Sequence, residues 1–348
     1  MEAPRPVPVY LQATAPGRQR GSFVGTVGRY VLLVVFVVSV LLNFYLIMIL
    51  RAGIEESEYR PGWNNQKIAL IDLSGMIDMD SPGSLRRMLR KANEDETVKG
   101  VILVINSPGG QVAPSAMMHR YLEDFQNPPL RLEEESQEGE EKSRGRGKPV
   151  YAAIEQLGAS GAYWAATAAE KIFAQENAMV GSIGVIYMNA VLRDLLESKL
   201  GVTPVVIKSS RSPHKDRGSF LRLPTAEEEV EIRADLDTIH KRFVSVVQEG
   251  RNLTEEQAWA VANGEVYDGP ESLELGLVDG VGYLDDAIDA MASDLGLERP
   301  TVVRYAQPPT VLEAIGVRWP GGAVVVDIEA QLEKLATMPR IQALYLGQ

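Results

Sequence analysis

A single long apolar run dominates the hydrophobic pattern near the N-terminus. Residues 30–50 read YVLLVVFVVSVLLNFYLIMIL and contain no charged side chain. As a helix rising about 1.5 Å per residue, this run would span about 30 Å, the thickness of the hydrocarbon core of a membrane. The alternatives are a buried core helix and a cleaved signal peptide, but the apolar region of a signal peptide is only about 7–15 residues long. The pattern therefore favours an uncleaved transmembrane helix.

From residue 66 onward, short apolar runs alternate with segments in which apolar residues recur at helical spacing. The short runs predict strands, and the helical spacing predicts helices. Strands are predicted at residues 67–73, 98–105, 149–154, 171–174, 179–186 and 204–208. One helix is predicted to start with Ser81 as cap and Pro82 at its first position, and others at residues 114–125, 161–170, 189–200, 225–250 and 254–263. Strand–helix units repeated in this order predict an α/β fold.

The longest predicted helix carries signals at both ends. Thr225 and Glu228 have the spacing of a capping box at its start. Gly250 is the expected stop, because glycine commonly ends helices. His240 lies inside this helix beside two charged residues, so we expect it to face solvent.

These patterns divide the chain into segments. Residues 1–29 are rich in Pro, Gly and Arg and are predicted to form a mobile cytoplasmic tail, and residues 51–65 a polar linker. One catalytic domain is expected over residues 66–298. Within it, the charged stretch 131–147 is predicted to be a solvated surface insertion. No role is assigned to residues 299–348.

Charge around the apolar run predicts the orientation of the chain. Four arginines precede the run, whereas three glutamates and two arginines follow it closely. The positive-inside rule then places the N-terminus in the cytoplasm and the large C-terminal portion outside the cytoplasmic membrane.

Composition excludes several classes of function. The chain has no cysteine, which excludes a thiol nucleophile, disulfides and a cysteine–zinc site. It has three histidines, His119, His214 and His240, which limits histidine-based catalysis to few candidates. Its net charge of −12 argues against a nucleic-acid partner, which would require a basic surface. No metal or cofactor is implied.

Small residues surround one serine just after the predicted strand 149–154. Residues 158–166 read GASGAYWAA and enter a predicted helix at Gly161. A serine at a helix N-terminus lies in a positive electrostatic field, which would help to stabilise a nucleophilic oxygen and a developing oxyanion. The alternative is that Ser160 only caps the helix, and this segment alone favours that alternative.

A glycine-rich turn after the predicted strand 98–105 changes this balance. Residues 106–110 read NSPGG. Two glycines after a buried strand can present backbone N–H groups to a ligand, and an oxyanion hole commonly uses a pair of such donors. One donor could come from Gly109 and the other from Gly161. An ordinary strand-to-helix turn is the alternative.

Together these segments resemble the signal peptide peptidase A family, a family of serine peptidases in the Clp-protease and crotonase superfamily. The matching pieces are INSPGG at 105–110, ASGAYWAA at 159–166, AAEKIF at 168–173 and VGSIGVI at 180–186, in the order of the family, with a less diagnostic match at 264–280. The resemblance covers about residues 66–290. It implies a Clp-protease/crotonase-like domain of repeated strand-strand-helix units, preceded here by one transmembrane helix.

The resemblance implies a serine–lysine dyad in which Ser160 is the nucleophile. Lys215, in the loop SSRSPHKDRG at 209–218, stands where the family has its catalytic lysine, and Lys208 is the runner-up. Ser182 matches a family position that orients the lysine. A lysine ordinarily has a pKa of about 10.4, so a lysine base must be buried in an apolar site to lose its proton at neutral pH.

Two residues qualify this match. The family often has a second glycine where this chain has Ala162, whose methyl group would lie near the substrate path and narrow the accepted side chains. His214 is adjacent to Lys215, so spacing alone does not dismiss a Ser–His pair. Adjacent side chains in an extended segment point in opposite directions, so we expect only one of the two to face Ser160.

The expected function is that of a membrane-anchored serine endopeptidase that acts through an acyl-enzyme. By resemblance, its substrates would be cleaved signal peptides or membrane-proximal polypeptides. The alternatives are a protease of specific membrane proteins, an inactive peptide-binding scaffold of the same fold and, more distantly, an acyl-CoA enzyme of the crotonase type. Family members with one catalytic domain assemble into rings, so a homo-oligomer is expected.

Overall fold

The computed structural model describes residues 23–50, 54–128 and 147–306. Almost all of the predicted insertion at 131–147 and most of the extension at 299–348 lie outside the described residues. The described chain falls into two units, one containing the N-terminal helix and the other all the remaining elements.

The apolar run near the N-terminus forms one long helix, α1 (Phe23–Leu50). It begins earlier than expected, so residues 23–29, which the sequence predicts as part of the mobile tail, are helical. The stretch Gly28–Tyr45 is long and apolar enough to cross a membrane, and none of it is buried within the protein. Apart from Arg29, Ser39 and Asn43, the side chains of this stretch are apolar or aromatic, so it has no broad polar face.

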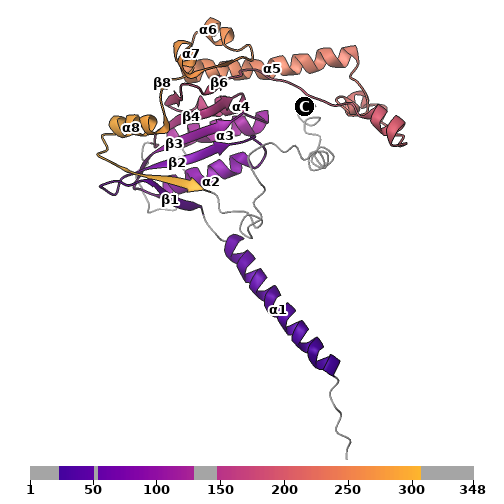
Figure 1. Ribbon diagram of the computed structural model, residues 1–348. Coiled ribbons are helices and arrows are strands. Elements are labelled where there is room, and N and C mark those ends of the chain that lie inside the picture. Colours follow the sequence, from indigo (N-terminus) through magenta and orange to yellow (C-terminus); the bar gives the residue numbers. More distant parts are fainter. Residues whose placement is uncertain (1–22, 51–53, 129–146, 307–348) are drawn as a thin grey trace, which may run out of the picture. The chain divides into compact units, whose positions relative to one another are not determined.

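A mixed sheet of nine strands forms the centre of the second unit (Figure 1). The strands are β1 (Glu55–Arg60), β2 (Lys67–Ser74), β3 (Val98–Ser107), β4 (Val150–Ala159), β5 (Lys171–Ala174), β6 (Met179–Gly181), β7 (Val266–Tyr267), β8 (Gly280–Val281) and β9 (Thr301–Ala306). Their order is β1-β9-β2-β3-β4-β5-β8, and β6 pairs with β4 and β7. The strands β9, β2, β3, β4, β5 and β8 are parallel neighbours, whereas β1 is antiparallel to β9.

Helices cover both faces of this sheet. They are α2 (Ser81–Glu94), α3 (Val112–Gln126), α4 (Gly161–Ala166), α5 (Ala226–Arg251), α6 (Glu255–Ala260), α7 (Gly269–Glu274) and α8 (Leu284–Asp294). Alternate residues of β2 serve different faces: Ala69 and Ile71 share a core with α2 to α5, while Ile68 and Leu70 share a second core with α8. Both faces of the strands are therefore apolar, as parallel strands between helical layers require. The predicted α/β class is confirmed.

The sheet extends beyond the predicted catalytic domain of residues 66–298. Residues 55–60, predicted as linker, form β1, and β9 lies past the predicted end of the domain. Val302 and Tyr305 of β9 are buried beside β2. The polar strand β1, with the sequence EESEYR, has mostly exposed side chains at the sheet edge. The sequence pattern did not predict this strand because its side chains are mostly polar and exposed. Charged side chains on an edge strand discourage pairing with the strands of other chains.

Three predictions for residues 182–208 are wrong, and we call residues 186–208 of this segment the apolar arm. Strand β6 ends at Gly181 rather than continuing to residue 186. The predicted helix 189–200 is reduced to a short helical segment that includes a five-residue π-type turn, Leu195–Lys199. The predicted strand 204–208 does not form, although its residues favour strands, because Val205 and Ile207 are 77% and 91% exposed and no described strand pairs with them. Strand propensity reflects packing on a sheet, and this segment has no sheet to join.

The start of α5 follows the prediction, but its end does not. Thr225 Oγ1 accepts a hydrogen bond from Glu228 N (3.2 Å), and the Glu228 carboxylate accepts one from Thr225 N (2.9 Å), so the predicted capping box is confirmed. The helix passes through Gly250 to Arg251 and is capped by Asn252, which takes the left-handed conformation with φ 52°. Gly250 serves packing instead, because a Cβ there would lie 2.4 Å from the Thr167 carbonyl oxygen.

His240 is half-buried, whereas the sequence led us to expect a side chain facing solvent. Its ring meets Trp259 edge-on at 5.4 Å, and its Nε2 is buried with no partner among the described residues. A little further along α5, Phe243 stacks on Trp164 of α4 with ring centroids 4.8 Å apart. The C-terminal half of α5 therefore packs on α4, and all the buried apolar residues of α5 lie in this half.

Two other helix boundaries differ from the prediction. Asp80 rather than Ser81 is the cap residue of α2, because the Ser81 hydroxyl is engaged with the backbone and carboxylate of Asp78. Helix α4 ends at Ala166 instead of residue 170, where the Thr167 hydroxyl donates to the Trp164 carbonyl (2.7 Å). Side-chain bonds of this kind compete with helix continuation.

Candidate active site

Four of the predicted site residues, Gly109, Ser160, Gly161 and Ser182, lie just past the carboxyl ends of β3, β4 and β6. The turn after β3 is held by the loop after β2. Ile77 N–H donates to the Gly109 carbonyl (2.8 Å), and Gln111 N–H donates to the Ile77 carbonyl (2.9 Å). The carboxyl edge of a parallel sheet is where such folds place their ligands. Neither Ile77 nor Gln111 carries a sequence signal for this role, because their contribution is made by the backbone.

Ser160 occupies the sharp turn between β4 and α4. Its φ of 53° and ψ of −124° are unfavourable for a residue with a side chain. The turn is held by bonds from Ser160 N–H to the Gly181 carbonyl (2.8 Å) and from Trp164 N–H to the Ser160 carbonyl (2.9 Å). The Ser160 hydroxyl makes no capping bond to α4, so capping does not explain the serine. Strain held by the surrounding structure is a recognised mark of functional sites.

Gly109 and Gly161 approach each other more closely than any side chain would allow. A Cβ on Gly109 would lie 2.6 Å from Gly161 N and 2.9 Å from Ser160 Cβ, and Gly109 has a φ of +88°. A Cβ on Gly161 would lie 2.1 Å from the hydroxyl of the fully buried Ser115. Both positions therefore require glycine, and the structure brings the two predicted oxyanion residues together beside Ser160.

The hydrogen bonds of the glycine turn distinguish Gly109 from Gly110. Gly109 N–H donates to the Ser107 hydroxyl (3.1 Å), which in turn donates to the Gly75 carbonyl (2.6 Å). Gly110 N–H has no partner among the described residues and lies 3.4 Å from the position that a Cβ on Gly161 would occupy. As the first N–H of α4, Gly161 N–H also lacks a partner within its helix. The geometry thus favours Gly110 over Gly109 as the second donor.

Ser182 lies beside the Ser160 turn. Gly181 pairs with Ala159 in the ladder between β6 and β4, and Ser182 follows directly. Ser182 has a φ of 49° and donates its N–H to the Glu265 carbonyl (2.6 Å). The position suits an orienting role near Ser160, which stays a prediction.

Ala162 does not line a substrate path, which corrects the expectation drawn from the sequence. Its side chain is fully buried in the core shared by α2 to α5. Because α4 directs this methyl group into the core, it does not contact solvent or a substrate bound at the surface.

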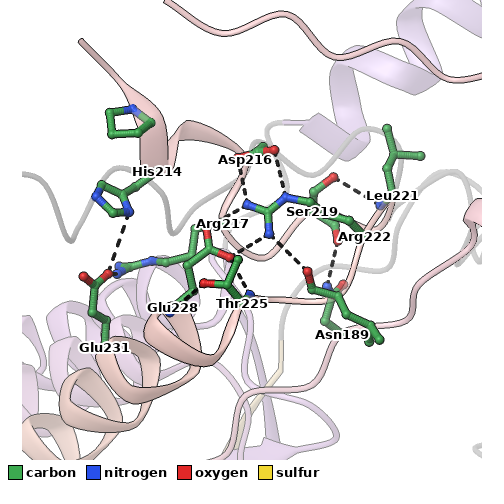
Figure 2. Close-up of polar contacts among 12 residues, drawn as sticks. Asn189, His214, Asp216, Arg217, Ser219, Leu221, Arg222, Thr225, Glu228 and Glu231 are labelled. Carbon is green, nitrogen blue, oxygen red and sulfur yellow. Dashed lines mark hydrogen bonds and ion pairs between the residues drawn. The ribbon is translucent and has the colours of Figure 1, made fainter. Parts of the chain in front are cut away.

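Lys215 lies in a 3₁₀ turn, Pro213–Asp216, and its side chain is exposed. Its ammonium makes no hydrogen bond or ion pair with any described residue. The neighbouring His214 is 61% exposed, with Nδ1 3.9 Å from a Glu231 carboxylate oxygen (Figure 2). Lys208, the alternative base, is committed to Asp216, to which it donates at 2.6 Å.

The structure does not bring Lys215 to Ser160 within one chain. The turn that carries Lys215 is bonded to the first turns of α5, through contacts such as Arg217 to Glu231. The other half of α5 packs on α4 at Phe243. At about 1.5 Å per residue, the helix between Glu231 and Phe243 spans about 18 Å. Figure 1 shows the segment around residue 215, coloured pink to red, at the end of α5 away from the sheet.

Within the described ranges, no group of three or more His, Asp or Glu side chains is arranged to hold a metal ion. The donors at this site are instead backbone N–H groups and hydroxyls, which suit a developing negative charge on a carbonyl oxygen.

Gly109→Ala is expected to lower kcat about a hundredfold or more, because the added methyl group would push the turn away from Gly161 and misplace an oxyanion donor. The measurement is steady-state hydrolysis of a fluorogenic peptide. Gly296→Ala is the matched control: Gly296 also has positive φ (63°), but a Cβ there meets nothing within 4 Å. Equal losses in both variants would show that backbone strain, and not the collision at the site, accounts for the effect.

Sequence comparison relates the chain to known peptidases. The model of peptidase family S49 matches residues 142–298, which include Ser160, Ser182 and Lys215. A protein of Enterococcus faecium named as a signal peptide peptidase is 33% identical over 268 residues, which cover 74% of this chain and 72% of that protein. A Synechocystis protein named as a protease is 34% identical, with 67% of this chain and 76% of that protein covered.

Two further matches are less complete. Protease 4 of Haemophilus influenzae is 29% identical over 68% of this chain, which spans only 36% of that longer protein. A solved structure of a ClpP1 mutant from Listeria monocytogenes resembles the chain with a TM-score of 0.39 and 15% identity, covering 63% of this chain and 94% of that one. The sequence matches to the Enterococcus and Synechocystis proteins are extensive enough to decide the family. The chain belongs to peptidase family S49 and is a serine peptidase.

Proposed function

We propose that this chain is a membrane-anchored endopeptidase in which Ser160 is the nucleophile and Lys215 the general base. The observation that carries the proposal is the strained turn at Ser160, whose hydroxyl makes no capping bond and which lies beside the N–H groups of Gly161 and Gly110. Backbone donors fixed next to a serine oxygen are what acyl transfer requires.

The proposed reaction has two steps. Ser160 Oγ bonds to the carbonyl carbon of the substrate while its proton passes to the neutral Lys215 amine. The peptide C–N bond then breaks, the proton leaves with the new amine, and the acyl-enzyme remains. Water attacks this ester, Lys215 takes its proton and returns it to Ser160, and the acid product departs. The N–H groups of Gly161 and Gly110 stabilise the oxyanion in both steps, with Gly110 taking the place first assigned to Gly109, and Ser182 orients the lysine.

A ring of identical chains would complete the dyad. Because α5 holds Lys215 away from Ser160 of its own chain, the lysine of one copy would serve the serine of a neighbour. A lysine base also needs shelter from water, and Lys215 is exposed on the single chain. Contact with a neighbouring copy would bury the lysine and exclude water from it.

The apolar arm supports such an assembly. Its exposed large side chains include Ile186, Met188, Leu200, Val205 and Ile207. Monomeric soluble domains rarely expose so many large apolar residues in one segment, and such surfaces mark contacts with other proteins or membranes. A second copy would bury the arm at the same time as it joined Lys215 to Ser160.

The proposed substrates are cleaved signal peptides or other membrane-proximal polypeptides. An anchored enzyme meets such chains at the membrane surface, and the Enterococcus relative is named for signal peptides. A protease of specific membrane proteins is the alternative. The two are distinguished by comparing cleavage of a peptide library with cleavage of a panel of intact membrane proteins. Only a general peptidase would cut short apolar peptides of many sequences.

Reaction with a fluorophosphonate tests the proposal against an inactive scaffold. The reagent should label the full-length protein at one site, and peptide mapping should place the label on Ser160. A protein that hydrolyses peptides but carries the label on another serine would contradict the assignment.

The proposed topology places residues 52–348 outside the cytoplasmic membrane, because arginines precede the apolar run and glutamates follow it. Protease added to intact spheroplasts should therefore degrade the C-terminal portion. A cytoplasmic protein in the same cells is the control and should survive until lysis. Full protection of the C-terminal portion in intact spheroplasts would reverse the proposed orientation.

A further inference from the structure

Arg222 bridges the turn that carries Lys215 and the start of helix α5. Its Nε and Nη2 donate to the two carboxylate oxygens of Asp216 (both 2.9 Å). Its Nη1 and Nη2 donate to the two carboxylate oxygens of Glu228 (2.6 and 2.7 Å). The remaining N–H donates to the Leu223 carbonyl (3.1 Å). All five guanidinium donors are thus used, so the side chain has one orientation.

Asp216 ties this arginine to the base, since it is the residue next to Lys215. Figure 2 shows Arg222 reaching Asp216 beneath the turn. The Lys208 ammonium also donates to Asp216 and to the Pro213 carbonyl (2.8 Å). These two bonds join the first and last residues of the turn. Hydrogen bonds from Arg222 and then Lys208 hold the pKa of Asp216 well below its usual range, so the carboxylate is charged at neutral pH.

Glu228 ties the same arginine to the start of α5. It is the capping-box glutamate, and its carboxylate bonds both Arg222 and the Thr225 N–H. The Asp216 and Glu228 side chains are only 13% and 8% exposed. A second arginine, Arg217, reaches Glu231 (2.7 Å) and continues the attachment along the helix.

We propose that Arg222 is a positioning residue for the catalytic base, because it fixes the turn that carries Lys215 on the start of α5. Helix α5, whose other end packs on α4, then holds the lysine in a defined position. This inference rests on the proposed role of Lys215. Ion pairs with partial exposure add little to stability, but a guanidinium that grips two carboxylates through paired bonds fixes geometry. The function of this cluster is therefore the placement of the ammonium group.

The first test compares the kinetics of full-length variants. Arg222→Ala should lower kcat about 10- to 100-fold with KM changed less than about threefold, because small displacements of a catalytic group are costly to the chemical step. Arg222→Lys should fall between, since lysine keeps the charge but cannot form the paired bonds. Arg233→Ala is the matched control. Arg233 bridges Glu229 on the exposed side of the same helix and touches no residue of the turn, so kcat should stay at the wild-type value.

The second test mixes pairs of impaired variants, which separates a misplaced base from a damaged fold. An Arg222→Ala chain keeps an intact Ser160, and a Ser160→Ala chain keeps an intact Lys215 turn. Their mixture should regain activity, whereas Arg222→Ala mixed with Lys215→Ala should not, because neither chain then offers a placed base. Asp216→Asn should repeat both results, as it breaks one side of the bridge and leaves the Glu228 capping box in place.

The outcomes distinguish this inference from the proposed function. Wild-type kcat in Arg222→Ala, together with loss in Lys215→Ala, would overturn the positioning role and leave the base assignment standing. Full activity of Lys215→Ala would overturn the base assignment itself. Failure of Ser160→Ala to restore Arg222→Ala, under conditions in which it restores Lys215→Ala, would show that Arg222 supports the fold and does not place the base.

Discussion

Ser160→Ala is expected to abolish peptide hydrolysis by the full-length chain, with kcat reduced about 10⁴-fold or more. The change removes the oxygen that we propose forms the acyl-enzyme. The fold should survive, because Ser160 makes its structural contacts through its backbone N–H and carbonyl. Thermal melting should therefore match the wild type, or exceed it slightly.

Ser245→Ala is the control for this substitution. Ser245 lies on α5, where its hydroxyl donates only to the Lys241 carbonyl (3.1 Å), so its loss should leave kcat unchanged. Hydrolysis of a fluorogenic peptide and labelling by a fluorophosphonate are the two measurements. Near wild-type turnover in Ser160→Ala would rule out Ser160 as the nucleophile.

Lys215→Ala is expected to reduce kcat by about a thousandfold or more, whereas His214→Ala should retain most of the activity. The two neighbours have different surroundings, which supports this expectation. His214 faces Glu231, whereas the Lys215 ammonium has no described partner and is available to a neighbouring copy. The opposite pattern of loss would replace the Ser–Lys dyad with a histidine mechanism.

The pH dependence of the wild-type enzyme decides the case if both variants are inactive. A histidine base must be neutral, so activity through histidine falls as the pH drops through about 6.5. A lysine base is neutral only at higher pH, so the rate should rise into the alkaline range. A plateau above pH 7 with a limb near 6.5 would contradict the lysine assignment.

Mixing Ser160→Ala with Lys215→Ala tests whether the dyad joins two copies. If chains assemble at random in equal amounts, about a quarter of neighbouring pairs combine an intact serine with an intact lysine. Activity should then return to about a quarter of the wild-type value. No recovery, despite proven exchange of chains, would place both residues of the dyad in one chain.

Several features of this protein could be predicted because they depend on neighbours in sequence. The strand at 171–174 was predicted with its observed bounds, because KIFA is a short apolar run between turn residues. The capping box of Thr225 and Glu228 involves residues one helical turn apart, and local spacing specifies it. The small residues around Ser160 likewise permit a sharp strand-to-helix turn wherever they occur.

Other features depend on residues far apart in sequence. Glu55 pairs with Ala306, and nothing in the sequence near either residue indicates the other. The choice between Gly109 and Gly110 as oxyanion donor is made by Ile77, whose backbone engages one glycine carbonyl and leaves the next N–H unpaired. Two adjacent glycines look equivalent in the sequence, and only the approach of another loop distinguishes them.

The sequence by itself determined the apolar helix and the α/β class, since each follows from local composition and spacing, whereas the assignment of Ser160 as nucleophile is implied by the family resemblance. Tertiary structure alone decided where Lys215 lies. Its place depends on Arg222, Asp216 and Glu228, which bond the turn to one end of α5, and on Phe243, which anchors the other end on α4. Because the helix rises about 1.5 Å per residue, contacts at its two ends keep the proposed base and nucleophile of one chain apart. Sequence spacing carries no information about that separation, because it results from packing between distant segments.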